Sequence, residues 1–112
     1  MNIFQSIQHA VKEVVGSCYP ITVPEKPDIP YAVYMQVSNT PEVTVENTIP
    51  IESSRVQVDV YAKTYAESQD LGGRVRDALM AIGAIPLSAG DLYESDVKLY
   101  RVTQDFSVWF QK

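Results

Sequence analysis

Histidine and cysteine, the side chains most often used for metal binding and nucleophilic chemistry, are scarce in this 112-residue sequence, and the spacing of the other reactive types does not assemble a site. His9 is the only histidine and Cys18 the only cysteine. A metal centre at His9 would need carboxylates as all its other ligands, so we interpret His9 as a surface or boundary residue. No internal disulfide is possible. Cys18 has no basic neighbours, and we interpret it as a small packing residue rather than a reactive thiol.

Acidic residues and glycines give no catalytic pattern either. A carboxylate pair catalyses only when its surroundings separate the two pKa values, and a pair such as Asp91 and Glu94 indicates no more than solvated surface. The Gly72-Gly73 pair is not a phosphate loop, because no strand ends there and no Lys-Ser/Thr pair follows. We therefore expect no enzyme, no cofactor site and no metal site.

Composition indicates one globular domain spanning residues 1–112, with 46% hydrophobic and 21% charged residues. No apolar run approaches the ~20 residues that cross a bilayer, and no secretory leader is evident, so we expect no membrane partner. The net charge is −5, and the nine basic residues are scattered. Specific nucleic-acid binding needs clustered Lys and Arg, so this charge pattern argues against it.

The clearest elements lie between Arg55 and Ile82. Apolar residues alternate with polar ones from 55 to 62, which predicts a half-buried strand. Thr64 and Glu67 form a T-x-x-E capping box, which predicts the start of an amphipathic helix that ends near Gly83. The glycines at 72 and 73 each cost that helix about 1 kcal/mol, a cost offset by close backbone approach inside the domain or at a subunit interface. The predicted helix face consists of Leu71, Val75, Ala78, Leu79 and Ile82.

Weaker patterns predict the remaining elements. A first helix begins after Asn2 and ends near Gly16, and a stiff connection with four prolines covers 17–30. Residues 31–37 form a strand, residues 84–96 a loop, and residues 100–110 either one long strand or a hairpin. Segment 39–53 is extended but ambiguous, with a possible turn at Asn47-Thr48.

These elements predict an α+β two-layer sandwich. Its mixed or antiparallel sheet of about four strands carries two helices on one face, in the order α-β-(β)-β-α-β(β). The other sheet face stays uncovered and would present Tyr34, Gln36, Gln57, Asp59, Tyr61, Arg101 and Trp109. Aromatic residues beside an arginine are typical of a protein interface core, but loop 84–96 folding over them would explain the pattern equally well.

The run PYAVYMQVSNTPE, the strand RVQVDVYA and the helix start TYAES occur in this order within residues 30–110. In this order they resemble the phage tail-completion family, also described as tail-terminator, head-tail joining or minor tail proteins. The resemblance implies a structural virion protein of the tail or neck, assembled in the host cytoplasm. It also implies a six-subunit ring, as members of this family form, that caps the head-proximal end of the tail tube and ends tube polymerisation.

The same resemblance implies several partners: further copies in a homohexameric ring, the tail tube protein, and the head-tail connector or neck protein. DNA would pass through the ring lumen without specific binding, since the chain is acidic. We expect six interface residues: Tyr34, Glu42, Glu46, Tyr61, Arg101 and Trp109.

An alternative function belongs to another class of protein. The element order is compatible with a dimeric ferredoxin-like domain that binds or oxidises a small apolar ligand between sheet and helices. Met35, Phe106 and Phe110 would line such a pocket.

Overall fold

The computed structural model describes residues 2–42 and 51–111, with side chains described except at 38–42, 51, 52 and 111. Two helices and five strands occur within these residues, in an order that confirms the predicted α+β class. The edge strands β1 and β4 were not predicted, and the described parts of the ambiguous segment 39–53 belong to β2 and β3 instead of forming a strand of their own. The elements are α1 (Ile3–Val15), β1 (Cys18–Pro20), β2 (Tyr31–Glu42), β3 (Ile51–Ala62), α2 (Tyr65–Ala81), β4 (Ile85–Glu94) and β5 (Leu99–Gln111).

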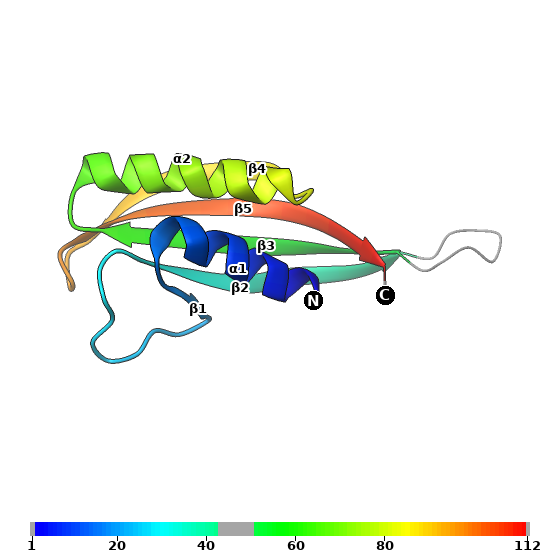
Figure 1. The fold of residues 1–112 in the computed structure, drawn as a ribbon, viewed down its shortest axis with the longest axis horizontal. Helices are drawn as coiled ribbons and strands as arrows, with labels where there is room; N and C mark the ends of the chain where they lie inside the picture. Colours follow the sequence, from blue (N-terminus) through cyan, green and yellow to red (C-terminus); the bar gives the residue numbers. More distant parts are fainter. Residues whose placement is uncertain (1, 43–50, 112) are drawn as a thin grey trace.

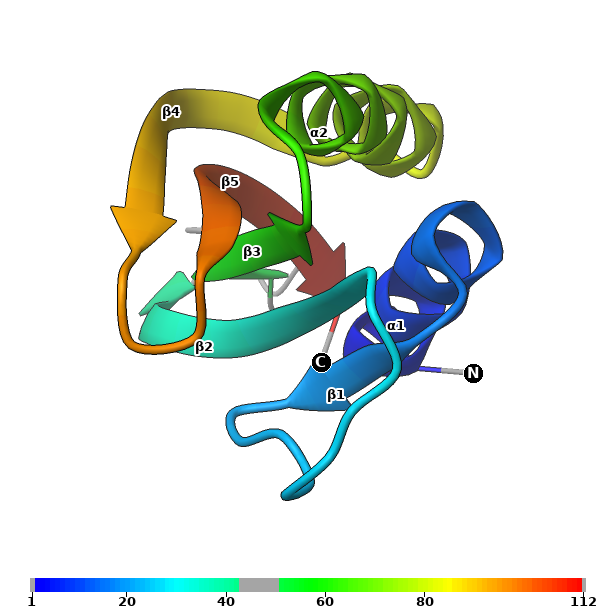
Figure 2. The ribbon, with the colours of Figure 1, turned by 90° about the vertical axis from the view of Figure 1, so that its left-hand side faces the viewer.

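The strands form one mixed sheet in the order β1-β2-β3-β5-β4. β1 pairs in parallel with β2, and all the other pairings are antiparallel. The three central strands contain 12 or 13 residues each, and they run along the longest dimension of the molecule (Figure 1). Both helices lie on the same face of the sheet (Figure 2), as the two-layer prediction requires. We call the sheet face opposite α1 and α2 the open face.

Both helices begin and end at the predicted signals. Asn2 and Gln5 form a reciprocal capping box at the start of α1, and Gly16 ends that helix with a φ of 102°. The Thr64 hydroxyl accepts a hydrogen bond of 3.1 Å from the backbone N–H of Glu67 at the start of α2. Neither described helix combines the length and hydropathy needed to cross a lipid bilayer.

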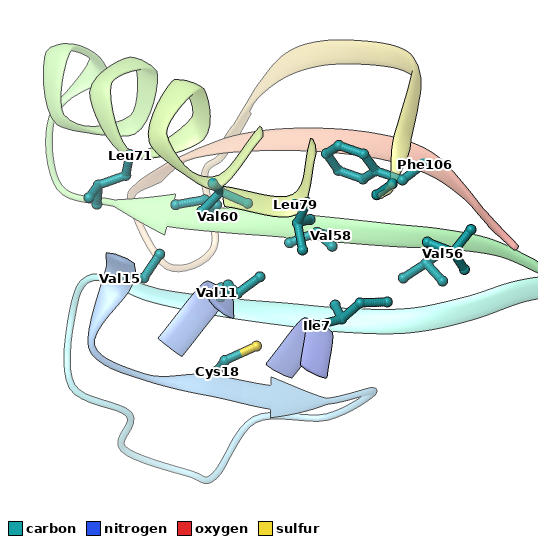
Figure 3. Packing of buried hydrophobic residues seen from close by; sticks show 14 residues of the cluster. Ile7, Val11, Val15, Cys18, Val56, Val58, Val60, Leu71, Leu79 and Phe106 are labelled. Atoms are coloured by element: carbon teal, nitrogen blue, oxygen red, sulfur yellow. The ribbon is translucent and has the colours of Figure 1, made fainter. Parts of the chain in front are cut away.

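The core lies between the two helices and the covered face of the sheet (Figure 3). The predicted β3 parity is confirmed, since Val58, Val60 and Ala62 are 0% exposed. β5 is one continuous strand, and its Phe106 is the largest fully buried side chain. The buried residues between the helices and the sheet form one cluster: Ile7, Val11, Val15, Cys18, Ala32, Val56, Val58, Val60, Leu71, Val75, Leu79, Ala84, Phe106 and Val108.

The predicted orientation of β2 is wrong. Tyr34 pairs with Val58 and Gln36 pairs with Val56, so both lie on the helix side of the sheet. Tyr34 packs against the core cluster, and burial raises the pKa of its hydroxyl. Both parities of this strand are rich in apolar residues, and the helices cover the parity that carries Ala32, which is 0% exposed.

The segment predicted as a loop from 84 to 96 contains a strand, β4, on the edge of the sheet. Its residues are almost all exposed on both faces, so no alternation of apolar and polar residues marks it. Pro86 and Gly90 are tolerated because an edge strand does not need a complete hydrogen-bond ladder on both sides. The register shifts between Pro86 and Ser88, which adds a bulge to this edge.

Candidate functional site

A groove of about 580 Å³ lies on the open face. Its floor comes from residues of β2, β3 and β5 that alternate with the buried ones and therefore point away from the helices. One wall is the segment after β1, and the other is the turn that joins β4 to β5. We define the open-face groove by its lining residues: Ile21, Thr22, Val23, Tyr31, Val33, Met35, Gln57, Asp59, Tyr61, Glu94, Asp96, Val97 and Arg101.

Arg101 holds the polar part of the groove together. Its guanidinium donates hydrogen bonds of 2.9 Å to Asp59 Oδ2 and to Glu94 Oε1. The Asp59 side chain is only 9% exposed, and it also accepts hydrogen bonds from the Gln57 amide. Burial alone would lower the pKa of Arg101, but its hydrogen bond to Glu94 and the charge of Asp59 raise it above the ordinary value. This network ties the β4–β5 turn to the middle of the sheet.

An aromatic row continues the groove floor from the arginine. The rings of Tyr61 and Tyr31 stack with their centroids 4.8 Å apart. The centroid of the Tyr19 ring lies 6.3 Å from that of Tyr31. The Arg101 guanidinium carbon lies 5.7 Å from the centroid of the Tyr61 ring, within the range of a cation–π contact. Burial raises the pKa of the hydroxyls of Tyr31 and Tyr61.

The groove walls offer apolar side chains to solvent. Ile21 is 67% exposed and Val97 is 55% exposed, on opposite sides of the groove. Each terminal nitrogen of Arg101 has a carboxylate partner, so the groove has an apolar rim around a polar floor in which one cation is shared by two carboxylates. Such a surface suits non-covalent binding of a polypeptide better than a proton or group transfer.

The six predicted interface residues do not form one patch. Tyr61 and Arg101 pair with each other on the predicted open face, and both line the groove. Trp109 shares the open face and is 48% exposed, but it pairs with Ser53 and lies eight residues, about 27 Å, along β5 from Arg101. Tyr34 is on the covered face. For Glu42 only the backbone pairing with Ile51 is described, and Glu46 lies outside the described residues.

The loop proposed to cover the open-face aromatics does not do so. Residues 85–94 pair beside β5 instead, which leaves Trp109 exposed and closes only one side of the groove. Sequence reasoning missed Tyr31, Val33 and Met35 as groove residues. The available signal was that β2 is apolar on both parities, which indicates a strand with contacts on both faces.

The pocket proposed for a small apolar ligand is not formed by the residues expected to line it. Phe106 is 1% exposed in the core, and Phe110 packs edge-on against Phe4 with centroids 5.9 Å apart. Met35 lies on the opposite side of the sheet, in the open-face groove. The three side chains therefore do not share a cavity between sheet and helices.

The remaining chemistry-bearing residues have structural surroundings. Cys18 is buried in the core, and burial raises the pKa of its thiol to about 12, which confirms a packing role. His9 is exposed on α1, 3.1 Å from Glu13. Asp91 accepts hydrogen bonds from the Tyr65 hydroxyl and the Gln69 amide. Across residues 2–42 and 51–111, no three His, Cys, Asp or Glu side chains gather closely enough to hold a metal ion.

Comparison with known proteins adds a family and a fold. The model of the family described as "Tail completion protein gp17" matches residues 6–111. A chain of the virion of a native gene transfer agent particle is similar in structure, with a TM-score of 0.56 and 12% identity over 97% of this chain and 91% of that chain. The gp17 protein of bacteriophage SPP1 has a TM-score of 0.49 and 20% identity over 93% of this chain and 89% of that chain. No curated protein matches this sequence.

Proposed function

Because this chain belongs to the tail completion protein gp17 family, whose model matches residues 6–111, we propose that it caps the head-proximal end of a phage tail tube. Its role is that of a structural protein of the virion tail and not that of an enzyme. In the proposed role, copies of the chain form a closed ring, most simply a hexamer. The ring ends tube polymerisation and presents the surface that joins the tail to the head connector or neck protein.

The family match carries this proposal, and the edges of the sheet support it. A tube grows when each subunit offers the next one a surface to continue. Here the β1 edge is three residues long and ends at Pro20, and the β4 edge contains Pro86 and a bulge. Short strands, prolines and bulges are the devices that prevent strand-by-strand addition at a sheet edge. A subunit with two blunted edges is suited to ending an assembly.

The net negative charge of the chain supports a role in which the protein does not bind DNA specifically. A net charge of −5 gives the protein no general attraction for phosphates. If the ring surrounds the path of the genome, an acidic lumen would let DNA pass without specific binding.

The exposed Trp109 is the residue of the open face that we assign to contacts with the tail tube or the connector. It is a large aromatic side chain, 48% exposed, far from the groove and outside the core. Charge reversal at Glu42 and Glu46, or Trp109→Ala, should block tail completion without unfolding the domain.

The proposed function is tested by deleting the gene for this chain from its phage genome and supplying wild-type or variant protein from a plasmid. Electron microscopy should show free heads and tails of uncontrolled length without the protein, and joined particles of normal length with it. Trp109→Ala should not restore joining, while Gly73→Ala, a change at an exposed helical site, should. Normal particles in the absence of the protein would refute the proposed function.

A further inference from the structure

The strand register divides the floor of the open-face groove into two lanes. Three side chains of β2 form an apolar lane: Tyr31, Val33 and Met35. Their register partners on β3 form a second lane that is more polar: Tyr61, Asp59 and Gln57. Neighbours within a lane are two residues apart, which is about 6.5–7 Å along a strand. The apolar and polar parts of the floor therefore lie side by side and are not mixed.

The two walls of the groove repeat this division. Ile21 and Val23 form the wall beside β2, because they follow β1, which pairs with β2. Glu94, Asp96 and Val97 form the wall beside β5, at the turn from β4. One wall is thus apolar, and the opposite wall carries two carboxylates together with one exposed apolar side chain.

The lining of the groove carries more negative than positive charge. Its ionised groups are the carboxylates of Asp59, Glu94 and Asp96 and the single guanidinium of Arg101, a net charge of −2 at neutral pH. Arg101 is shared between Asp59 and Glu94, and Asp96 forms no ion pair with any residue in the described ranges. Lys98, in the same turn, is exposed and does not line the groove. The groove therefore suits a cationic ligand.

The negative potential extends across the floor. Burial is the larger cause of the raised pKa of the Tyr31 hydroxyl, and the charge of Glu94 raises that pKa further. Tyr31 belongs to β2, which is separated from β5 by β3, so the charge of the turn wall acts on the far side of the groove. A phosphate or an acidic peptide would meet repulsion there, whereas a basic side chain would be attracted.

We propose that the open-face groove binds an extended segment of another protein of the particle, in which one lysine or arginine stands between two apolar residues. In an extended segment, residues i and i+2 point to one side and residue i+1 points to the other. The two apolar side chains would lie against the β2 lane and Ile21, and the basic side chain would reach Asp96 and Glu94. This inference rests on the proposed tail-capping function only in placing the partner in the same particle.

Net charge disfavours a second copy of this chain as the occupant. Two chains of net charge −5 repel each other overall. A basic segment of a different protein does not meet this repulsion. Exposed ion pairs contribute little binding free energy by themselves, so the exposed side chains of Ile21 and Val97 are needed to supply apolar contact beside the charge pair.

A peptide selection on the purified chain tests the proposed chemistry. A display library of random peptides of about seven residues is selected on the immobilised wild-type protein, and the enriched sequences are read. We expect enrichment of peptides with a lysine or arginine between two apolar residues, and weaker binding of the synthetic peptides as the salt concentration rises. Enrichment of acidic or uncharged peptides, or no enrichment, would overturn the proposal.

Two charge reversals locate the bound peptide. Asp96→Lys should raise the Kd of an enriched peptide about tenfold, since it replaces an attraction by a repulsion. Asp77→Lys is the matched control, because Asp77 is an exposed carboxylate on α2, over the opposite face of the sheet (Figure 2). It makes the same change in net charge and should leave the Kd unchanged. Equal effects of the two reversals would refute binding in the groove.

A substitution at Ile21 tests the apolar wall without damaging the fold. The backbone of Ile21 has a φ of 64°, a conformation that asparagine adopts more readily than a β-branched residue. Ile21→Asn should therefore preserve or raise stability in urea unfolding, while it raises the Kd of the peptide about tenfold through lost apolar contact. A variant that binds like wild type would contradict the assigned wall.

Suppressor genetics tests the partner in the particle. In the phage that lacks its own copy of the gene, plasmid-borne Asp96→Lys should fail to restore joined particles, whereas Asp77→Lys should restore them. Second-site mutations that rescue Asp96→Lys should replace a lysine or arginine by an acidic residue in the gene of another structural protein. Rescue by Asp96→Lys itself would overturn the proposal, as would suppressors confined to the gene of this chain, which would indicate a second copy.

The two proposals fail in different ways. Normal particles in the absence of the protein refute the tail-capping function, while the peptide selection still decides what the groove binds. Loss of joined particles on gene removal, together with normal joining by Asp96→Lys, refutes the assigned groove and leaves the tail-capping function intact.

Discussion

The side-chain amide of Gln104 donates a hydrogen bond of 2.7 Å to the backbone carbonyl of Gly72. This buried contact joins the middle of β5 to the middle of α2, between two residues that are 32 positions apart in the sequence. Gln104 is the one polar residue on the buried parity of β5, and it is 6% exposed. The close approach of helix and strand at this point explains why a glycine occupies the helix interior.

The two adjacent glycines of α2 should respond oppositely to the same substitution. A Cβ at Gly72 would lie 3.0 Å from both Gln104 Nε2 and Val102 Cγ1, whereas a Cβ at Gly73 would meet nothing within 4 Å. Gly72→Ala should lower the free energy of unfolding by about 1–3 kcal/mol. Gly73→Ala should raise it by about 0.5–1 kcal/mol through helix propensity. Urea unfolding of both variants checks this, and equal effects of the two substitutions would show that helix and strand are not in contact here.

Arg101 should contribute more to stability than Arg55, although each pairs with an aspartate across β3 and β5. Arg101→Ala would leave Asp59, which is 7% exposed, without its cation, so we expect a loss of about 1–3 kcal/mol. Arg55 is 50% exposed in its 3.0 Å pair with Asp105, and Arg55→Ala should cost less than about 1 kcal/mol. Thermal and chemical unfolding of the two variants measure the difference. A larger loss for Arg55→Ala would contradict the burial of the Asp59–Arg101 pair.

Cys18 should make folding stability depend on alkaline pH. Burial raises the pKa of the thiol from 9.0 to about 12, so the folded state holds this proton more tightly than the unfolded state. The stabilising effect is therefore complete below about pH 9 and is lost as the pH rises toward 12. Unfolding free energies measured at several pH values should fall less steeply for Cys18→Ala than for wild type in this range. Identical slopes would mean that the thiol is accessible to water.

Phe106 and Trp109 lie three residues apart on β5 and should behave as a core and a surface aromatic. Phe106→Ala should cost about 3–5 kcal/mol, because the ring is 1% exposed at the centre of the core. Trp109→Ala should change the unfolding free energy by less than about 1 kcal/mol, since half of its side chain is exposed. Denaturant unfolding separates the two, and a strongly destabilised Trp109→Ala would make it a structural rather than a contact residue.

The central elements were predictable because single-sided patterns marked them. Val56, Val58 and Val60 are apolar on one parity only, so the buried face of β3 followed from the alternation. Thr64 and Gly83 bracket α2 with capping signals that act through local hydrogen bonds and backbone angles. Strand parity and helix caps depend on neighbouring residues, so both can be predicted from a short stretch of sequence.

The orientation of β2 and the strand β4 were predicted wrongly because their sequences do not alternate between apolar and polar residues. Tyr31 and Val33 are as apolar as Ala32 and Tyr34, and parity alone cannot say which pair lies under the helices. The β4 edge strand is exposed on both faces, so burial imposed no pattern on it and it was predicted as a loop.

The groove depends on contacts that no local pattern records. Arg101 reaches Asp59 across 42 residues of sequence, and the pairing follows from the β3–β5 register. The wall formed by Ile21 and Val23 depends on the parallel pairing of β1, a strand of only three residues. Two of the predicted site residues, Tyr61 and Arg101, fall in the groove because they were correctly placed on the open face.

The most direct test of the tail-capping account is to locate the chain on intact particles. A short epitope tag on this protein, labelled with gold-conjugated antibody, is imaged by electron microscopy on tails released from heads and on joined particles. The account predicts label at one end only of each free tail, the end that faces the head, and at the neck of joined particles. Label distributed along the tube or at the distal tip, or particles without the protein, would contradict it.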